Sequence, residues 1–103
     1  MQTITLSPSG FKELLSIELC PEQINRITVE NHGNEVTAEV SVNWRYEAEN
    51  IEISAFDSEG DVAELDAEQY REFCNQVDVA LYKIEQEDIS ARKQQEYLYH
   101  MCL

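Results

Sequence analysis

The chain has 103 residues, 43% of them hydrophobic, and 21 acidic residues against 7 basic ones give a net charge of −14. This length fits one domain, residues 1–103, with a single hydrophobic core, and the apolar content exceeds that of a disordered acidic tail. The charge argues against direct binding to nucleic acid, because phosphate contacts need Lys and Arg.

The first elements are short. Residues 3–6 are the candidate for an additional N-terminal edge strand. Ser7 and Pro8 then predict the N-cap and first residue of a short helix. This helix would carry Phe11, Leu14 and Leu15.

Residues 24–30 and 35–47 predict the two strands of a hairpin. In the second strand, one parity is apolar or aromatic and the other is polar, which is the pattern of a strand with one buried face. Folding about His32 and Gly33 brings apolar residues opposite each other. The register expected is Val29 with Val36, Ile27 with Ala38, Thr28 with Thr37 and Arg26 with Glu39.

A second reversal is predicted at residues 47–50, with a third strand at residues 50–56. The pairing of this third strand with the second would make Trp44 an aromatic residue of the core. The pairs expected are Tyr46 with Ile51, Trp44 with Ile53 and Arg45 with Glu52. The three strands would form an antiparallel meander.

Residues 57–61 predict a type I turn with Gly60 in the left-handed conformation. Asp66 then predicts the N-cap of a helix, with Gln69 completing a capping box. One side of this helix is apolar and should lie on the sheet. The stripe consists of Tyr70, Phe73, Cys74, Val77, Leu81 and Ile84.

The apolar stripe is interrupted at Asp88, which predicts a new N-cap. Residues 67–100 are therefore expected to form two helices rather than one, the second running from about residue 89 to residue 100. The fold class predicted is α+β, a three-stranded antiparallel meander packed against helices in the order α-β-β-β-α-α.

No catalytic group stands out. The predicted buried positions are apolar, so the carboxylates are interpreted as a solvated surface, and we expect a protein that is not an enzyme. Residues 57–61 resemble a calcium loop only superficially, because Gly60 is fourth and not sixth from Asp57. His32 and His100 lack partners at ligand spacing, so no metal site is expected. The glycines are far apart and predict no phosphate-binding loop, so no cofactor is expected.

Two features favour a protein partner. Residues 47–88 hold fourteen acidic residues against Arg71 and Lys83, a local balance of −12. A basic partner is one use of such a field, and the alternative is that the charge only keeps the protein in solution. Val79 and Tyr82 lie among polar residues on the helix side opposite the apolar stripe, as anchors of a binding patch would. The alternative is that the last helix folds back and covers them. The candidate partner-binding residues are Glu49, Glu52, Asp57, Glu59, Asp61, Glu64, Glu68, Glu72, Val79 and Tyr82.

The strand hairpin followed by the acid-capped helix start at residues 64–69, together with size and charge, resembles small phage or mobile-element accessory proteins, including anti-CRISPR and anti-restriction factors. This resemblance implies a non-enzymatic inhibitor that mimics nucleic acid with its acidic surface. Its target would be a basic nucleic-acid-binding protein or a nuclease.

The alternatives are an immunity protein against a basic toxin, and a structural or assembly protein that self-associates, for instance as a homodimer, through Tyr97, Leu98, Tyr99 and Met101.

The odd set of cysteines (Cys20, Cys74 and Cys102) predicts no disulfide framework. No apolar run approaches the ~20 residues that span a bilayer, and the first residues do not resemble a secretory signal. We therefore expect a cytoplasmic location, which is the host cytoplasm if a phage encodes the protein, and no membrane partner.

Overall fold

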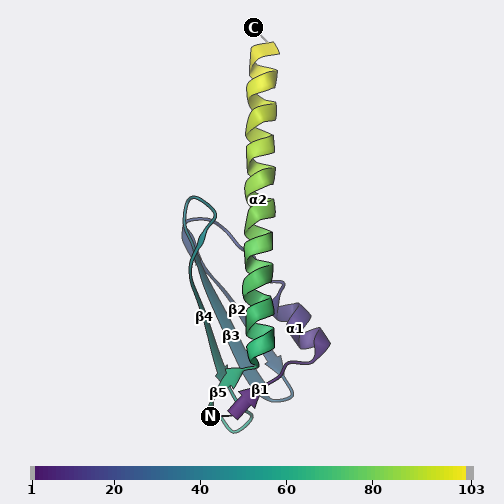
Figure 1. Cartoon of the computed structure of the whole chain (residues 1–103), viewed down its shortest axis with the longest axis vertical. Coiled ribbons are helices and arrows are strands. Elements are labelled where there is room, and N and C mark those ends of the chain that lie inside the picture. Colours follow the sequence, from purple (N-terminus) through teal and green to yellow (C-terminus); the bar gives the residue numbers. More distant parts are fainter. Residues whose placement is uncertain (1, 102–103) are drawn as a thin grey trace.

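The computed structural model describes the backbone of residues 2–101 and the side chains of residues 2–89. A five-stranded sheet in the order β1-β5-β4-β3-β2 is covered on one face by two helices (Figure 1). The predicted α+β class is confirmed. The elements are β1 Gln2–Ile4, α1 Pro8–Leu14, β2 Gln23–Asn31, β3 Asn34–Val42, β4 Ala48–Phe56, β5 Val62–Leu65 and α2 Ala67–Met101.

The β2–β3 hairpin has the predicted register, with Val29 opposite Val36 and Ile27 opposite Ala38. At its tip, His32 has a φ of 55° and Gly33 a φ of 81°. A two-residue turn with positive φ at both positions matches the twist of the flanking strands. The inner parity of the hairpin is buried against the helices, and Val29 and Val36 are fully buried.

The second reversal lies elsewhere than predicted, and the register expected for it is wrong. Strand β3 ends at Val42, so Ala38 and not Trp44 lies opposite Ile53. Asn43 closes the loop early, because its Oδ1 accepts hydrogen bonds from the backbone N–H groups of Arg45 at 2.8 Å and Glu47 at 3.0 Å. Asparagine side chains that mimic a backbone turn in this way compete with strand continuation. Trp44 is consequently 65% exposed and does not belong to the core.

The turn at residues 57–61 is confirmed and joins β4 to a strand that was not predicted, β5. Gly60 has a φ of 85°, and its N–H donates to the Asp57 carbonyl at 3.0 Å. Strand β1 is the N-terminal edge strand, with bounds shifted to Gln2–Ile4, and it runs parallel to β5. At four residues, β5 is too short for its alternation to be distinctive.

Both helix starts are capped where the sequence predicts. Ser7 Oγ accepts from the Gly10 N–H at 3.2 Å, and Asp66 Oδ1 accepts from the Glu68 N–H at 2.9 Å. The predicted capping box does not form. The side chain of Gln69 instead bridges the backbone N–H and carbonyl of Leu6, each at 2.9 Å.

The prediction of two C-terminal helices is also wrong, because α2 is continuous from Ala67 to Met101. The sequence has no Gly or Pro after Gly60 to break it. Asp88 does not begin a helix; its Oδ2 accepts a hydrogen bond from the Tyr46 hydroxyl at 3.1 Å. The helix therefore rises past the sheet (Figure 1), and the molecule extends 65 Å along its longest axis.

The core lies between the inner face of the sheet and the two helices. Leu14 of α1 and Phe73 of α2 are fully buried, and Val77 and Leu81 continue the helix stripe. The predicted stripe is thus the buried side of α2, although Cys74 and Ile84 are only half-buried and Tyr70 is 42% exposed. Within residues 2–101, no helix is long and apolar enough to cross a membrane.

Candidate functional site

The ten predicted partner-binding residues fall into two groups on opposite sides of the molecule. Strand β4, the following turn and β5 carry the first group, consisting of Glu49, Glu52, Asp57, Glu59, Asp61 and Glu64. Helix α2 carries the second group on the side turned away from the sheet, consisting of Glu68, Glu72, Val79 and Tyr82. One flat partner surface cannot contact both groups.

The six residues of the first group differ in their position and exposure. Glu52 and Glu64 are exposed on the uncovered face of the sheet, while Glu49 is the extra residue of a β-bulge between Ala48 and Asn50. Asp57 is half-buried, and its Oδ1 accepts hydrogen bonds from the N–H groups of Glu59 and Asp61, each at 2.9 Å. Asp57 therefore holds the turn, whereas Glu59 and Asp61 project their exposed carboxylates from it.

The uncovered sheet face also carries acidic residues that are not among the ten candidates. Glu39 lies opposite Glu52, and Glu30 lies opposite Glu35. The strand alternation had already indicated that Glu35 and Glu39 face solvent. We call Glu30, Glu35, Glu39, Glu52 and Glu64 the sheet carboxylates.

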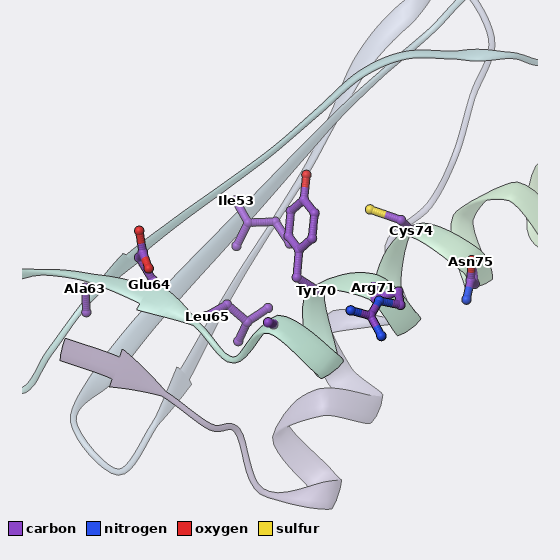
Figure 2. A pocket seen from close by; sticks show the side chains of 9 residues that line it. Ile53, Ala63, Glu64, Leu65, Tyr70, Arg71, Cys74 and Asn75 are labelled. Carbon is purple, nitrogen blue, oxygen red and sulfur yellow. The ribbon is translucent and has the colours of Figure 1, made fainter. Parts of the chain in front are cut away.

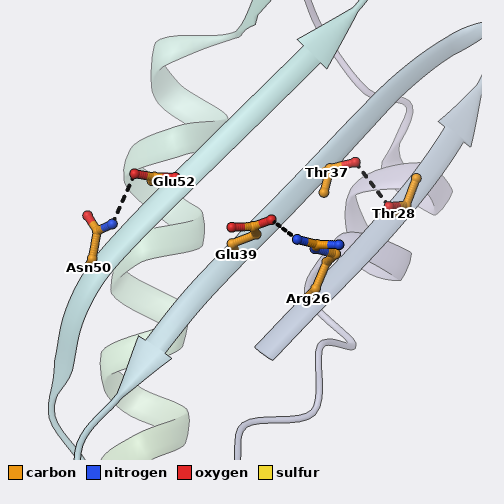
Figure 3. A network of polar contacts seen from close by, with 6 residues as sticks. All are labelled: Arg26, Thr28, Thr37, Glu39, Asn50 and Glu52. Atoms are coloured by element: carbon orange, nitrogen blue, oxygen red, sulfur yellow. Dashed lines mark hydrogen bonds and ion pairs between the residues drawn. The ribbon is translucent and has the colours of Figure 1, made fainter. Parts of the chain in front are cut away.

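The side chains that the structure describes neutralise little of this charge. Among the side chains that the structure describes, one ion pair forms, between Arg26 and Glu39 (Figure 3). Glu52 accepts a hydrogen bond from Asn50 Nδ2 at 3.1 Å, and Glu72 accepts one from Gln76 Nε2 at 2.9 Å. Neither donor is charged, so the negative field of these carboxylates extends into solvent.

Apolar side chains accompany the sheet carboxylates. Phe56 and Val62 lie opposite each other on β4 and β5 and are 40% and 62% exposed. Phe56 also lies opposite Glu35 on its other side. An exposed aromatic ring bordered by carboxylates is the composition of a binding surface with an apolar anchor and a charged rim.

The second group is exposed as predicted. Val79 is 47% exposed and Tyr82 is 64% exposed. The alternative in which a last helix folds back over them is wrong, because α2 continues as one helix. Tyr97, Leu98, Tyr99 and Met101, predicted for self-association, lie outside the residues whose side chains the structure describes, as do His100 and Cys102.

An open groove of about 570 Å³ lies between α2 and strands β4 and β5. Tyr70 and Cys74 project from α2 toward the space beside Ile53 (Figure 2). The negative charge of an ionised Cys74 raises the pKa of the Tyr70 phenol, and partial burial and a hydrogen bond between the two side chains add to this. The phenol is therefore neutral at physiological pH, and the groove offers mainly apolar contacts together with Glu64 and Arg71 at its border.

Within residues 2–89, no three His, Cys, Asp or Glu side chains are grouped so that they could hold a metal ion. Comparisons of this chain with protein-family models, with curated proteins and with solved structures found no match.

Proposed function

We propose that this protein is a non-enzymatic inhibitor that docks an acidic surface onto a basic protein, either a nucleic-acid-binding protein or a nuclease. The observation that supports this most directly is the lack of internal neutralisation. None of the eight acidic candidates forms an ion pair with a side chain that the structure describes. Like charges kept close together cost stability, and a cationic partner would recover that cost on binding.

The sheet carboxylates, of which Glu39 alone forms an ion pair with a described side chain, are the best candidate for the docking surface. They lie on one broad, uncovered face, and the registers place them in neighbouring strands. A protein groove that binds nucleic acid is lined with Lys and Arg for phosphate contacts. Rows of carboxylates on a rigid sheet would occupy such a groove in place of the phosphates, and the exposed Phe56 would add an apolar contact. We expect this to take place in the cytoplasm.

The proposal is tested by capture from a host lysate on the immobilised protein, with elution in a salt gradient. Each captured protein is then purified and assayed for nucleic acid binding with and without the acidic chain. We expect a basic protein that elutes as salt rises and that releases its nucleic acid when the chain is added. A captured protein whose nucleic acid binding is unaffected by saturating chain would contradict the proposal.

Two double charge reversals identify the docking surface, because they change the net charge equally on opposite sides. Glu52→Lys with Glu64→Lys alters the uncovered sheet face, and Glu68→Lys with Glu72→Lys alters the outer side of α2. We expect only the first pair to weaken inhibition, by ten-fold or more. Equal weakening by both pairs would mean that net charge alone governs binding.

A second candidate function is self-association, and the length of α2 favours it. The loop between β3 and β4 contacts α2 at Asp88, and the helix then continues to Met101, about 20 Å further at 1.5 Å per residue. Most of the stability of a helix in a protein comes from tertiary packing, so a second copy packed along this segment would stabilise it. A dimer whose mass does not change with salt, and which is lost on deletion of residues 90–103, would favour this function over the inhibitor.

A further inference from the structure

One edge of the sheet is left open along most of β4. Strand β4 spans nine residues, but β5 pairs only with Ala55 and Phe56 at one end of it. In the described part of the chain, no strand pairs with this edge from residue 49 to residue 53. Proteins usually protect edges of this kind, because unpaired backbone groups are a template for another chain.

The hydrogen bonds of the neighbouring turn show which backbone groups face the open edge. The Asp57 N–H donates to the Asp61 carbonyl at 2.9 Å, so the backbone groups of Asp57 face β5. Backbone groups alternate in direction along a strand, so those of Ile53 and Ile51 point to the same side, past Ala55, where the pairing of β4 with β5 stops. Those of Asn50 and Glu52 point to β3, consistent with their pairing with Ser41 and Glu39.

The groove lies next to this open edge, on the helix side of the sheet. Its walls include Ile53 and Leu65 from the strands and Tyr70 and Cys74 from α2 (Figure 2). Ile51 and Ile53 are half-buried on the same side. A strand added beside β4 would point every second side chain toward the groove.

The other side chains of such a strand would point to the uncovered face, where Glu52 and Glu64 are exposed. Opposite charges on neighbouring strands stabilise the pairing, and like charges oppose it. We infer that the open edge of β4 accepts an extended segment of the basic partner as an added strand, with apolar residues toward the groove and Lys or Arg beside Glu52 and Glu64. This inference rests on the proposed function, because the basic character of the segment comes from it.

Three synthetic peptides of equal length test the inference. The probe alternates Lys and Val, the second peptide alternates Lys and Pro, and the third alternates Glu and Val. Proline has no N–H and cannot complete a ladder of hydrogen bonds, but the second peptide keeps the charge of the probe. We expect the Lys-Val peptide to bind at least ten-fold more tightly than either control.

A proline substitution in the protein provides the reciprocal test. Ile51→Pro removes the N–H that faces the open edge, while the β3–β4 hydrogen bonds come from Asn50 and Glu52 and are retained. Ile51→Ala removes the same side chain and keeps the N–H, so it is the matched control. We expect Ile51→Pro to lose binding of the Lys-Val peptide by ten-fold or more relative to Ile51→Ala.

Amide resonances of the unaltered protein supply a measurement that does not depend on whether Ile51→Pro folds. Addition of the Lys-Val peptide should shift the amides of Ile51 and Ile53 more than that of Glu52, whose N–H faces β3. Equal binding of the Lys-Val and Lys-Pro peptides would overturn strand addition and leave the acidic docking surface standing. Failure of both lysine peptides to bind would overturn the inference together with the proposed function.

Discussion

Glu39 and Glu52 lie directly opposite each other on β3 and β4, and Arg26 forms an ion pair with Glu39 from the other side (Figure 3). Arg26 therefore pairs with one of the two facing carboxylates, Glu39. Like charges directly opposite each other in a sheet are destabilising. Glu52 is the member of this facing pair that has no charged partner among the described side chains.

Glu52→Lys should therefore stabilise the isolated protein while weakening the binding of its basic partner. The substitution replaces a repulsive cross-strand pair with an attractive one, which is worth about 0.2–1 kcal/mol. Urea denaturation measures the change in the free energy of unfolding. Glu49→Lys is the matched control, because it changes the net charge equally at the bulged residue, which has no residue directly opposite. A gain no larger than that of Glu49→Lys would show that general charge reduction, and not the pair, is responsible.

Trp44→Ala should have little effect on stability, in contrast to the role in the core that its sequence position predicts. The ring is 65% exposed, and Arg45 stacks over it with its guanidinium carbon 4.7 Å from the ring centre. An exposed cation–π contact is worth about 0.5–1 kcal/mol, so we expect a loss of that size. Phe73→Ala is the comparison, because its side chain is fully buried, and such a truncation costs about 3–5 kcal/mol. Similar losses in thermal or urea melts of the two variants would contradict the loop placement.

Gln69→Leu should destabilise the junction between the N-terminal segment and α2. The Gln69 amide satisfies both backbone groups of Leu6, a residue that is itself buried. Leaving such groups without partners costs about 1–3 kcal/mol. Hydrogen exchange of the Leu6 amide should accelerate together with the loss of stability.

Gln76→Leu is the matched control for that substitution, because Gln76 is exposed and its side chain bonds only to Glu72 among the described residues. We expect its free energy of unfolding to stay within about 0.5 kcal/mol of the parent, as for most surface substitutions. If Gln76→Leu is as destabilising as Gln69→Leu, the bridge to Leu6 is not the cause.

The elements that the sequence predicts correctly are those whose signals are local and independent. The β2–β3 register follows from alternation in two strands and a turn at His32 and Gly33 that leaves one pairing in which apolar residues match. The caps at Ser7 and Asp66 depend on a single side chain and the next turn of backbone. Each of these features is decided within about ten residues.

The errors come from competition between a local signal and a distant contact. Alternation continues to Tyr46, but the Asn43 side chain closes the loop first, and nothing in the alternation shows which will prevail. Gln69 fits a capping box, yet Leu6, which is distant in sequence, takes its amide. The open edge of β4 could not be predicted, since it depends on the short strand β5 ending at Leu65. The acidic candidates were identified by composition, but their division between two faces required the structure.

The phenol of Tyr70 links pH to the groove. Its pKa is raised, first by the negative charge of an ionised Cys74 and then by burial and the hydrogen bond between them. A tyrosine whose folded-state pKa is raised contributes stability below its unfolded pKa of about 10, and that contribution is lost as pH rises through the folded pKa.

Titration by phenolate absorbance, taken as the difference between parent and Tyr70→Phe, should therefore show Tyr70 ionising above the ordinary range. Cys74→Ala removes the thiolate and the hydrogen bond, so the Tyr70 pKa should fall toward its ordinary value and less stability should be lost in alkaline solution. An unchanged Tyr70 titration in Cys74→Ala would mean that the two side chains do not interact, and that the wall of the groove differs from the one shown in Figure 2.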